Sequence, residues 1–290
     1  PKHDPNFAWI NLQTTSNQFI SQEGVARIAN TMSALERRTR IEGLPIRFSN
    51  RVHPAWTDTP TLWCFACGEA VFSEREGVCG GCGGTNTVIF THVQVFDISP
   101  HWPTICLLDP HPRKPHMLLW VQIDGNDDWW IVAETEVQDD PVATAVRSRE
   151  IERSLKLSIA QRLMDPNMGR SPSGIQREIT WQDEFDRAGL YFELADDSDV
   201  GRARINDLLR PDKHTRKPRI TCHETCFWTD HQMKRYCWDD KDRQRPKPEH
   251  DDRPTLLKYL ANSDPSFKYL RSGGRPVQLF GEASYTVPTG

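Results

Sequence analysis

Two Cys-x-x-Cys pairs constrain the fold of this 290-residue chain more than any other local feature. Cys64 and Cys67 form the first pair, and Cys79 and Cys82 form the second a short distance later, among several glycines. Thiolates at this spacing sit on two tight turns and can close a tetrahedral zinc site, whose four protein ligands leave no open position. The sequence therefore predicts one structural Zn²⁺ in a zinc ribbon over residues 57–91.

Four cysteines remain outside the ribbon. Cys106 falls in a predicted core strand, while Cys222, Cys226 and Cys237 lie around a predicted strand-to-helix junction. Small thiols are common in protein cores. We therefore predict core packing for these four rather than a second metal site.

The composition describes a folded protein with no bulk attraction for nucleic acid. Its hydrophobic share of 37% is enough to fill a core, and its net charge is −4. Any contact with DNA must therefore come from local basic groups. No apolar run approaches the roughly 18 residues that cross a bilayer, and the first thirty residues lack a signal-peptide layout. We expect a cytoplasmic protein with no membrane contact.

Three apolar runs predict an antiparallel meander over residues 104–109, 116–124 and 129–137, because short segments rich in turn formers join them. Helices are predicted over 21–41, 140–155, 181–188, 200–209, 225–238 and 253–261, and further strands over 159–164, 190–194 and 219–222. Residues 169–174 are predicted to form a loop. This order is typical of an α/β, RNase H-like mixed sheet flanked by helices, here with an inserted zinc ribbon.

Acidic residues stand where this fold brings elements together. Asp109 ends the first meander strand, Asp165 follows a later strand, and Asp251 with Asp252 precedes the last core helix. Hard divalent cations need oxygen ligands, and two ions about 4 Å apart can drive phosphodiester hydrolysis. These four residues are the predicted catalytic group, with Asp109, Asp165 and Asp251 as the main Mg²⁺ or Mn²⁺ ligands. Glu134, inside the third strand, is an auxiliary candidate that could instead face solvent.

Basic residues follow two of these acidic positions. The loop after Asp109 also holds His111, a second auxiliary candidate. The predicted contacts to the DNA backbone are Arg113, Lys114, Arg170 and Arg177. The acidic clusters at 196–199 and 239–242 are interpreted as solvated surface. No phosphate-binding G-x-x-x-x-G-K-[ST] loop occurs, so no ATPase site is predicted.

Several short motifs, in the right order, resemble the large terminase subunits of tailed phages. Residues 23–54 resemble the connection between their ATPase and nuclease domains. Asp109-Pro-His-Pro-Arg-Lys-Pro-His116 resembles the opening strand and turn of the nuclease, and Met164-Asp-Pro-Asn167 its second acidic position. His250-Asp-Asp252 followed by Leu256-Leu-Lys-Tyr-Leu-Ala261 is similar to the closing acid-plus-helix motif.

This resemblance implies a two-metal endonuclease that cuts concatemeric double-stranded viral DNA during genome packaging in the host cytoplasm. It also implies partners in a portal protein and a small terminase subunit, with an oligomeric ring in the full-length motor and a monomer for this fragment. The expected organisation is a linker to an absent ATPase domain over 1–56, the ribbon over 57–91, the nuclease over 92–272 and a tail over 273–290.

The sequence departs from the family pattern in two places. Thr255 stands where many relatives have an acidic residue, so Asp251 and Asp252 must supply that function, and the ribbon is not general to the family. Two alternatives remain open. One is an RNase H-like junction resolvase or transposase relative. The other is a non-catalytic zinc-ribbon docking module of a packaging motor, whose carboxylates would be scattered or bound to arginines.

Overall fold

The structure is a computed structural model that describes residues 21, 23–25, 50–71, 77–138, 140–173, 178–239, 242 and 245–271. Most of the predicted helix over 21–41 and the tail over 273–290 lie outside these residues. The chain divides into two units. One contains Thr59–Phe90 and Lys213–Arg216; the other contains Arg51–Asp58, Thr91–Asp212 and the chain from Lys217.

The smaller unit is built on a three-stranded antiparallel sheet in the order β2-β1-β3. Its strands are β1 (Thr61–Cys64), β2 (Glu69–Val71) and β3 (Thr87–Phe90). Leu62 and Val71 pack with the cysteines in a small apolar cluster. Arg216, which is distant in sequence, also belongs to this unit. Its guanidinium lies 4.5 Å from the centre of the Phe65 ring and donates to Asn86 Oδ1 at 2.7 Å.

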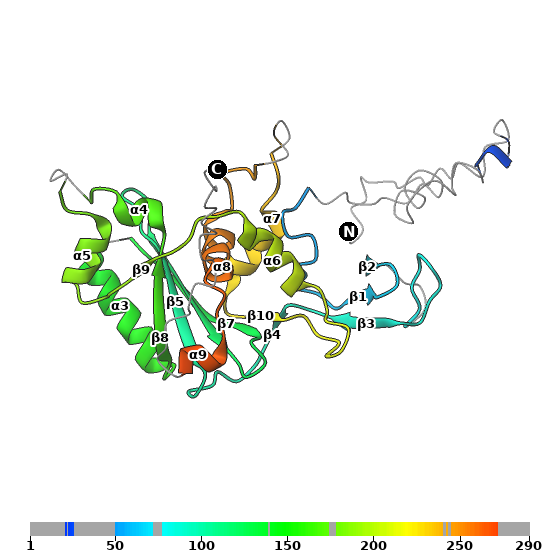
Figure 1. Cartoon of the computed structure of the whole chain (residues 1–290), viewed down its shortest axis with the longest axis horizontal. Coiled ribbons are helices and arrows are strands. Elements are labelled where there is room, and N and C mark those ends of the chain that lie inside the picture. Colours follow the sequence, from blue (N-terminus) through cyan, green and yellow to red (C-terminus); the bar gives the residue numbers. More distant parts are fainter. Residues whose placement is uncertain are drawn as a thin grey trace, which may run out of the picture. The chain divides into compact units, whose positions relative to one another are not determined.

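The larger unit contains a seven-stranded mixed sheet in the order β4-β10-β7-β6-β5-β8-β9 (Figure 1). The predicted antiparallel meander is confirmed as β5 (Pro103–Asp109), β6 (His116–Ile123) and β7 (Trp129–Val137). The flanking strands are β8 (Ser158–Met164), β9 (Glu193–Leu194), β10 (Ile220–His223) and β4 (Val93–Gln94). β8 runs parallel to β5, and β10 runs parallel to β7.

Helices cover both faces of this sheet (Figure 1). All of β6 is buried, and side chains of β5 alternate between two apolar clusters. Ile105 and Leu107 face the cluster with α6 (Val200–Leu209), α7 (Phe227–Arg235) and α8 (Asp252–Asn262). Cys106 and Leu108 face the cluster with α3 (Pro141–Ser154) and α5 (Trp181–Arg187). None of the helices in the described ranges is long and apolar enough to cross a membrane.

Local capping signals explain where several helices begin and end. The Asp140 side chain accepts from Ala143 N at 2.8 Å at the start of α3, and Thr180 forms a capping box with Asp183 at the start of α5. Gly189, with φ of 77°, directly follows Ala188, the C-cap of α5, and its left-handed backbone ends the helix.

Within the described residues, two helices were not predicted. α4 (Pro166–Arg170) replaces the first part of the expected loop, because Asp165 caps it and Pro166 occupies its first turn. α9 (Phe267–Arg271) follows α8. α7 is shorter than the predicted 225–238, since Trp238 pairs instead with Pro246 in an isolated bridge.

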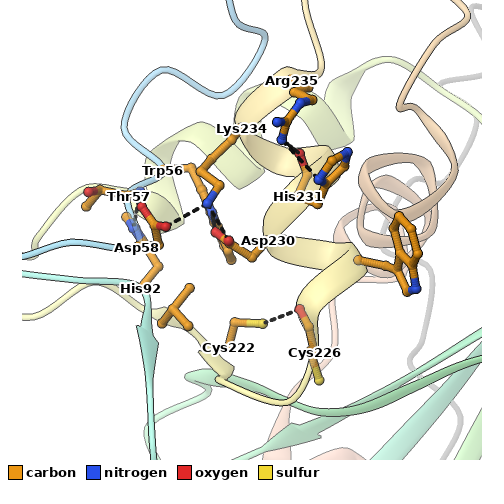
Figure 2. A network of polar contacts seen from close by, with 12 residues as sticks. Trp56, Thr57, Asp58, His92, Cys222, Cys226, Asp230, His231, Lys234 and Arg235 are labelled. Atoms are coloured by element: carbon orange, nitrogen blue, oxygen red, sulfur yellow. Dashed lines mark hydrogen bonds and ion pairs between the residues drawn. The ribbon is translucent and has the colours of Figure 1, made fainter. Parts of the chain in front are cut away.

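A polar network holds the segment Arg51–Asp58 against α7 (Figure 2). Trp56 Nε1 donates to Asp230 Oδ1 at 2.9 Å, and Lys234 Nζ lies 2.6 Å from Asp58 Oδ2 and 2.5 Å from Asp230 Oδ2. The Trp56 ring stacks on His92 with centroids 5.0 Å apart. These contacts all lie within the larger unit, so the segment is part of its fold and helps to fix α7.

Gly201 provides a test of how closely α6 packs against α8. A Cβ atom at this position would lie 2.6 Å from the carbonyl oxygen of Lys258. Helix propensity alone favours Gly201→Ala, but the clash of the added methyl group should outweigh that gain. The substitution should lower the free energy of unfolding, measured by urea titration, by about 1–3 kcal/mol. Gly125→Ala is the control, because nothing lies within 4 Å of its Cβ. A stabilised Gly201→Ala protein would contradict this packing.

Candidate functional site

The carboxyl ends of two parallel neighbouring strands bring Asp109 and Asp165 together. Asp109 is the last residue of β5, and Asp165 directly follows β8. The backbone N–H of Asp165 donates to the carbonyl of Leu108 at 2.9 Å, which continues the pairing of the two strands. Both acidic residues therefore stand at the same edge of the sheet.

The start of α8 reaches the same edge. Gln232 Nε2 on α7 donates to Asp252 Oδ2 at 3.0 Å. Lys114, in the turn after β5, places its Nζ 3.9 Å from Asp252 Oδ1. The structure thus brings Asp251 and Asp252, which adjoin each other at the first turn of α8, to the strand ends where Asp109 and Asp165 lie.

The electrostatics of Asp109 reflect this gathering of like charges. Burial, followed by the charges of Asp165, Asp252 and Asp251, raises the pKa of Asp109 to about 7. Burial and the neighbouring Asp252 also raise the pKa of Asp251. The carboxylate oxygens of these aspartates do not all lie within 4.8 Å of one another. Among the described residues, only the four cysteines form a group of three or more ligand atoms within 4.8 Å of one another.

Asp165 is held in place by three hydrogen bonds. Its Oδ1 accepts from Asn167 N and Met168 N, both at 2.7 Å, and its Oδ2 accepts from the hydroxyl of Tyr259. A carboxylate has about four acceptor positions, so Oδ2 keeps one free direction. Asp165 can therefore bind a cation through Oδ2 while Oδ1 keeps its hydrogen bonds to the first turn of α4.

Tyr259 was not predicted as a site residue. It is buried on α8, and burial and the Asp165 charge raise the pKa of its hydroxyl, which therefore stays protonated as a donor. Asp252 and Tyr259 are separated by two helical turns, so the spacing places them on one face of α8. This spacing from Asp252 was the sequence signal that could have identified Tyr259 as a site residue.

Glu134 has structural partners for both carboxylate oxygens. Oε1 accepts from Trp228 N at 2.6 Å, and Oε2 accepts from the backbone and hydroxyl of Thr229 at 2.9 and 2.7 Å. The fully buried Arg253 adds a bond from its Nε at 3.3 Å. Glu134 thus caps α7 and neutralises the buried Arg253, and its auxiliary role at the metal site stays a prediction.

The residues predicted near the acidic site or as DNA contacts differ in their hydrogen bonds and exposure. His111 Nδ1 accepts from the backbone of Arg113 at 3.0 Å and of Lys114 at 2.9 Å, so its ring shapes the turn after β5. Arg113, Lys114 and Arg170 are exposed. Arg177 lies outside the described residues. The arrangement places Lys114 beside the acidic edge and leaves binding of DNA by these side chains as a prediction.

Asp197 is exposed, as predicted for solvated surface. Its side chain also pairs with that of Lys258, which is 6% exposed, and accepts from Asn167 Nδ2 at 2.9 Å. The thiols of Cys106, Cys222 and Cys226 are buried, as predicted for core packing, while Cys237 is half-buried.

The four ribbon cysteines have the geometry of a metal site. The Sγ atoms of Cys64 and Cys82 lie 3.7 Å apart, as do those of Cys67 and Cys79. A tetrahedron with metal–sulfur bonds of about 2.3 Å has edges of about 3.8 Å. Burial acts to raise the pKa of Cys79, but backbone N–H groups of Cys82 and Gly81 lower it to about 7. The donor set therefore fits one Zn²⁺ with no open position.

The chain shares its fold with a solved large terminase from a thermophilic bacteriophage. That structure matches with a TM-score of 0.50 and 14% identity, over 87% of this chain and 54% of that chain. The chain thus corresponds to about half of that protein. This likeness concerns the fold alone, and it confirms the predicted RNase H-like mixed sheet flanked by helices.

Two nuclease structures were also found. The P22 large terminase nuclease domain matches with a TM-score of 0.46 and 14% identity, over 61% of this chain and 91% of that chain. The large terminase nuclease from thermophilic phage G20c with bound cobalt matches with a TM-score of 0.41 and 10% identity, over 75% and 98%. No protein-family model and no curated protein sequence matches the chain.

The ribbon should contain about one zinc per chain, measured by elemental analysis of the purified protein. Cys79→Ser should lose that zinc and lower the melting temperature, because the small sheet has little apolar core besides the metal site. Cys237→Ser, which alters a cysteine outside the cluster, should keep the zinc. A Cys79→Ser protein of unchanged stability and zinc content would contradict the site.

The raised pKa of Asp109 predicts a particular pH dependence in EDTA. Between its ordinary value of 3.8 and about 7, the folded protein holds a proton that the unfolded chain releases. The free energy of unfolding should therefore fall as pH rises through this window, by up to about 1.4 kcal/mol per pH unit from this group. Asp109→Asn should remove that slope and be the more stable protein at pH 8. Urea titrations over this pH range measure the slope and the stability at pH 8. The control Glu150→Gln, at an exposed residue, should show the same pH dependence as the unmodified chain.

Proposed function

We propose that this chain is a DNA endonuclease that uses two Mg²⁺ or Mn²⁺ ions held by Asp109, Asp165 and the Asp251–Asp252 pair. The observation that carries the proposal is the meeting of two parallel strand ends and one helix start at a single edge of the sheet. The carboxylates there supply the hard oxygen donors that such ions need. The raised pKa of Asp109 supports it, because like charges gathered at this edge favour a cation among them.

The surrounding residues suit this role. When bound, the ions would polarise the attacking water and stabilise the oxygen that leaves the phosphodiester. Tyr259 and the first turn of α4 keep Asp165 turned so that one direction of Oδ2 stays free. Lys114 carries a positive charge at the rim, where it can meet a phosphate or Asp252.

The substrate proposed is concatemeric double-stranded viral DNA, cut during genome packaging in the host cytoplasm. The terminase-like fold supports this context, and the portal protein and small terminase subunit are the partners it suggests. Arg113, Lys114 and Arg170 are the exposed basic residues nearest in sequence to the acidic strand ends. Because the net charge is −4, binding should depend on these local groups and weaken strongly as salt rises.

Single Asn substitutions at Asp109, Asp165 and Asp251 test the acidic site. Each removes one charge and one metal-binding oxygen at nearly constant volume, so cleavage of supercoiled and linear DNA in manganese should fall at least about a hundredfold. Folding should persist at Asp165 in particular, because Asn is also a good N-cap for α4. Gel assays with magnesium, manganese and EDTA measure the activity.

Asp239→Asn is the matched control and should cut normally, because Asp239 belongs to the turn that pairs with Arg245 instead of the acidic edge. A folded wild-type chain that cuts no DNA in either metal would overturn the proposal. Branched DNA cut faster than linear duplex would favour the resolvase alternative.

A further inference from the structure

Three aromatic rings of α7 and one ring just before α8 form a row at the surface. Phe227 and Trp228 are 60% and 47% exposed, and their ring centroids lie 5.3 Å apart. The His231 ring lies 5.7 Å from Phe227 and 5.6 Å from Trp228, and His250 lies 5.6 Å from His231. We call Phe227, Trp228, His231 and His250 the aromatic row.

The row begins at the acidic edge. His250 directly precedes Asp251, and Gln232, the neighbour of His231 on α7, donates to Asp252. From there the rings continue along α7 to its first turn. A molecule bound at the acidic edge could therefore extend over the row without leaving the larger unit.

Hydrogen bonds hold the first turn of α7, which carries Phe227 and Trp228. The backbone N–H groups of Trp228 and Thr229 are bound by Glu134, and Glu134 is itself paired with the buried Arg253. The rings are thus exposed on a helix whose first turn is firmly fixed. Exposed aromatic side chains on a fixed support are typical of surfaces that bind something.

The chemistry of the row favours nucleic-acid bases over an apolar protein segment. Two of its rings are imidazoles, and Arg235 Nη1 donates to His231 Nδ1 at 3.1 Å, which places a guanidinium at the same surface (Figure 2). Aromatic rings combined with arginine form stacking surfaces for single-stranded DNA, because every base offers a flat face. In a fully paired duplex those faces are covered by neighbouring base pairs.

We propose that the aromatic row binds unpaired bases of a DNA strand next to the acidic edge. The inference rests on the proposed function for its substrate. It adds that the preferred DNA has an unpaired stretch beside the cutting site, as at a frayed or freshly cut end. Phe227 and Trp228 make the main stacking contacts, and Arg235 contacts a base or a phosphate.

Binding in EDTA tests the row separately from cleavage. Fluorescence anisotropy of the full chain at low salt would compare a blunt duplex, the same duplex with an unpaired extension, and a single strand. The unmodified chain should prefer the two DNAs with unpaired bases. Trp228→Ala should weaken their binding about tenfold or more and leave the blunt duplex unchanged, while Trp228→Phe, which keeps a stacking ring, should retain most of the affinity. Phe227→Ala should act like Trp228→Ala.

Tyr191→Ala is the matched control, because Tyr191 is also an exposed aromatic residue, at 73%, outside the row. It should bind all three DNAs normally, and melting temperatures should show that each variant is folded. No preference for unpaired bases, or an equal loss for the blunt duplex, would overturn the row as a stacking surface. Unchanged DNA binding by Phe227→Ala and Trp228→Ala would do so too, and would favour a protein partner for the rings. A chain that shows the predicted binding but cuts no DNA would overturn only the proposed nuclease.

Discussion

The buried guanidinium of Arg253 determines how the functional parts of the larger unit are placed. Its Nε lies 3.3 Å from Glu134 and its Nη2 lies 3.1 Å from Glu136, so one side chain of α8 is bound to β7. Glu134 in turn holds the first turn of α7. A buried cation is tolerated only with such partners, and removing either partner leaves an uncompensated charge. Because Arg253 directly follows Asp252, the same contacts fix the acidic residues of α8 and the aromatic rings of α7.

Features that depend on neighbouring residues could be predicted from the sequence. The meander follows from apolar runs between turn formers, and the cysteine spacing specifies the ribbon because all four ligands lie close in sequence. The position of Asp109 and Asp165 at one edge followed from the expected fold, and the structure shows that their strands are parallel neighbours. Apart from β4, α4 and α9, the order of strands and helices in the larger unit could therefore be predicted from local patterns.

Features that depend on which side chain becomes buried could not be predicted. Arg253 has the appearance of a surface cation in a helix, and Glu134 that of an exposed strand residue, yet they neutralise each other inside the protein. The same holds for Lys258, which is nearly buried and pairs with Asp197. Such pairs join distant parts of the chain, and no local pattern marks them. Helix α4 is different, because the Asp165-Pro166 signal was present in the sequence and was interpreted only as the end of a strand.

The two candidate metal sites respond to the absence of metal in different ways. Burial raises the pKa of Cys64 and Cys67, so these two thiols stay neutral beside Cys79, and the gathering of the cysteines costs little charge repulsion. At the acidic edge, carboxylates repel one another, and Asp109 with a pKa of about 7 is protonated in a large fraction of molecules near neutral pH. A cation that binds there must displace that proton. The affinity of the acidic edge for the cation should therefore rise with pH across neutrality. The fold brings the carboxylates together before any ion binds, and the proton on Asp109 competes with the ion for this position.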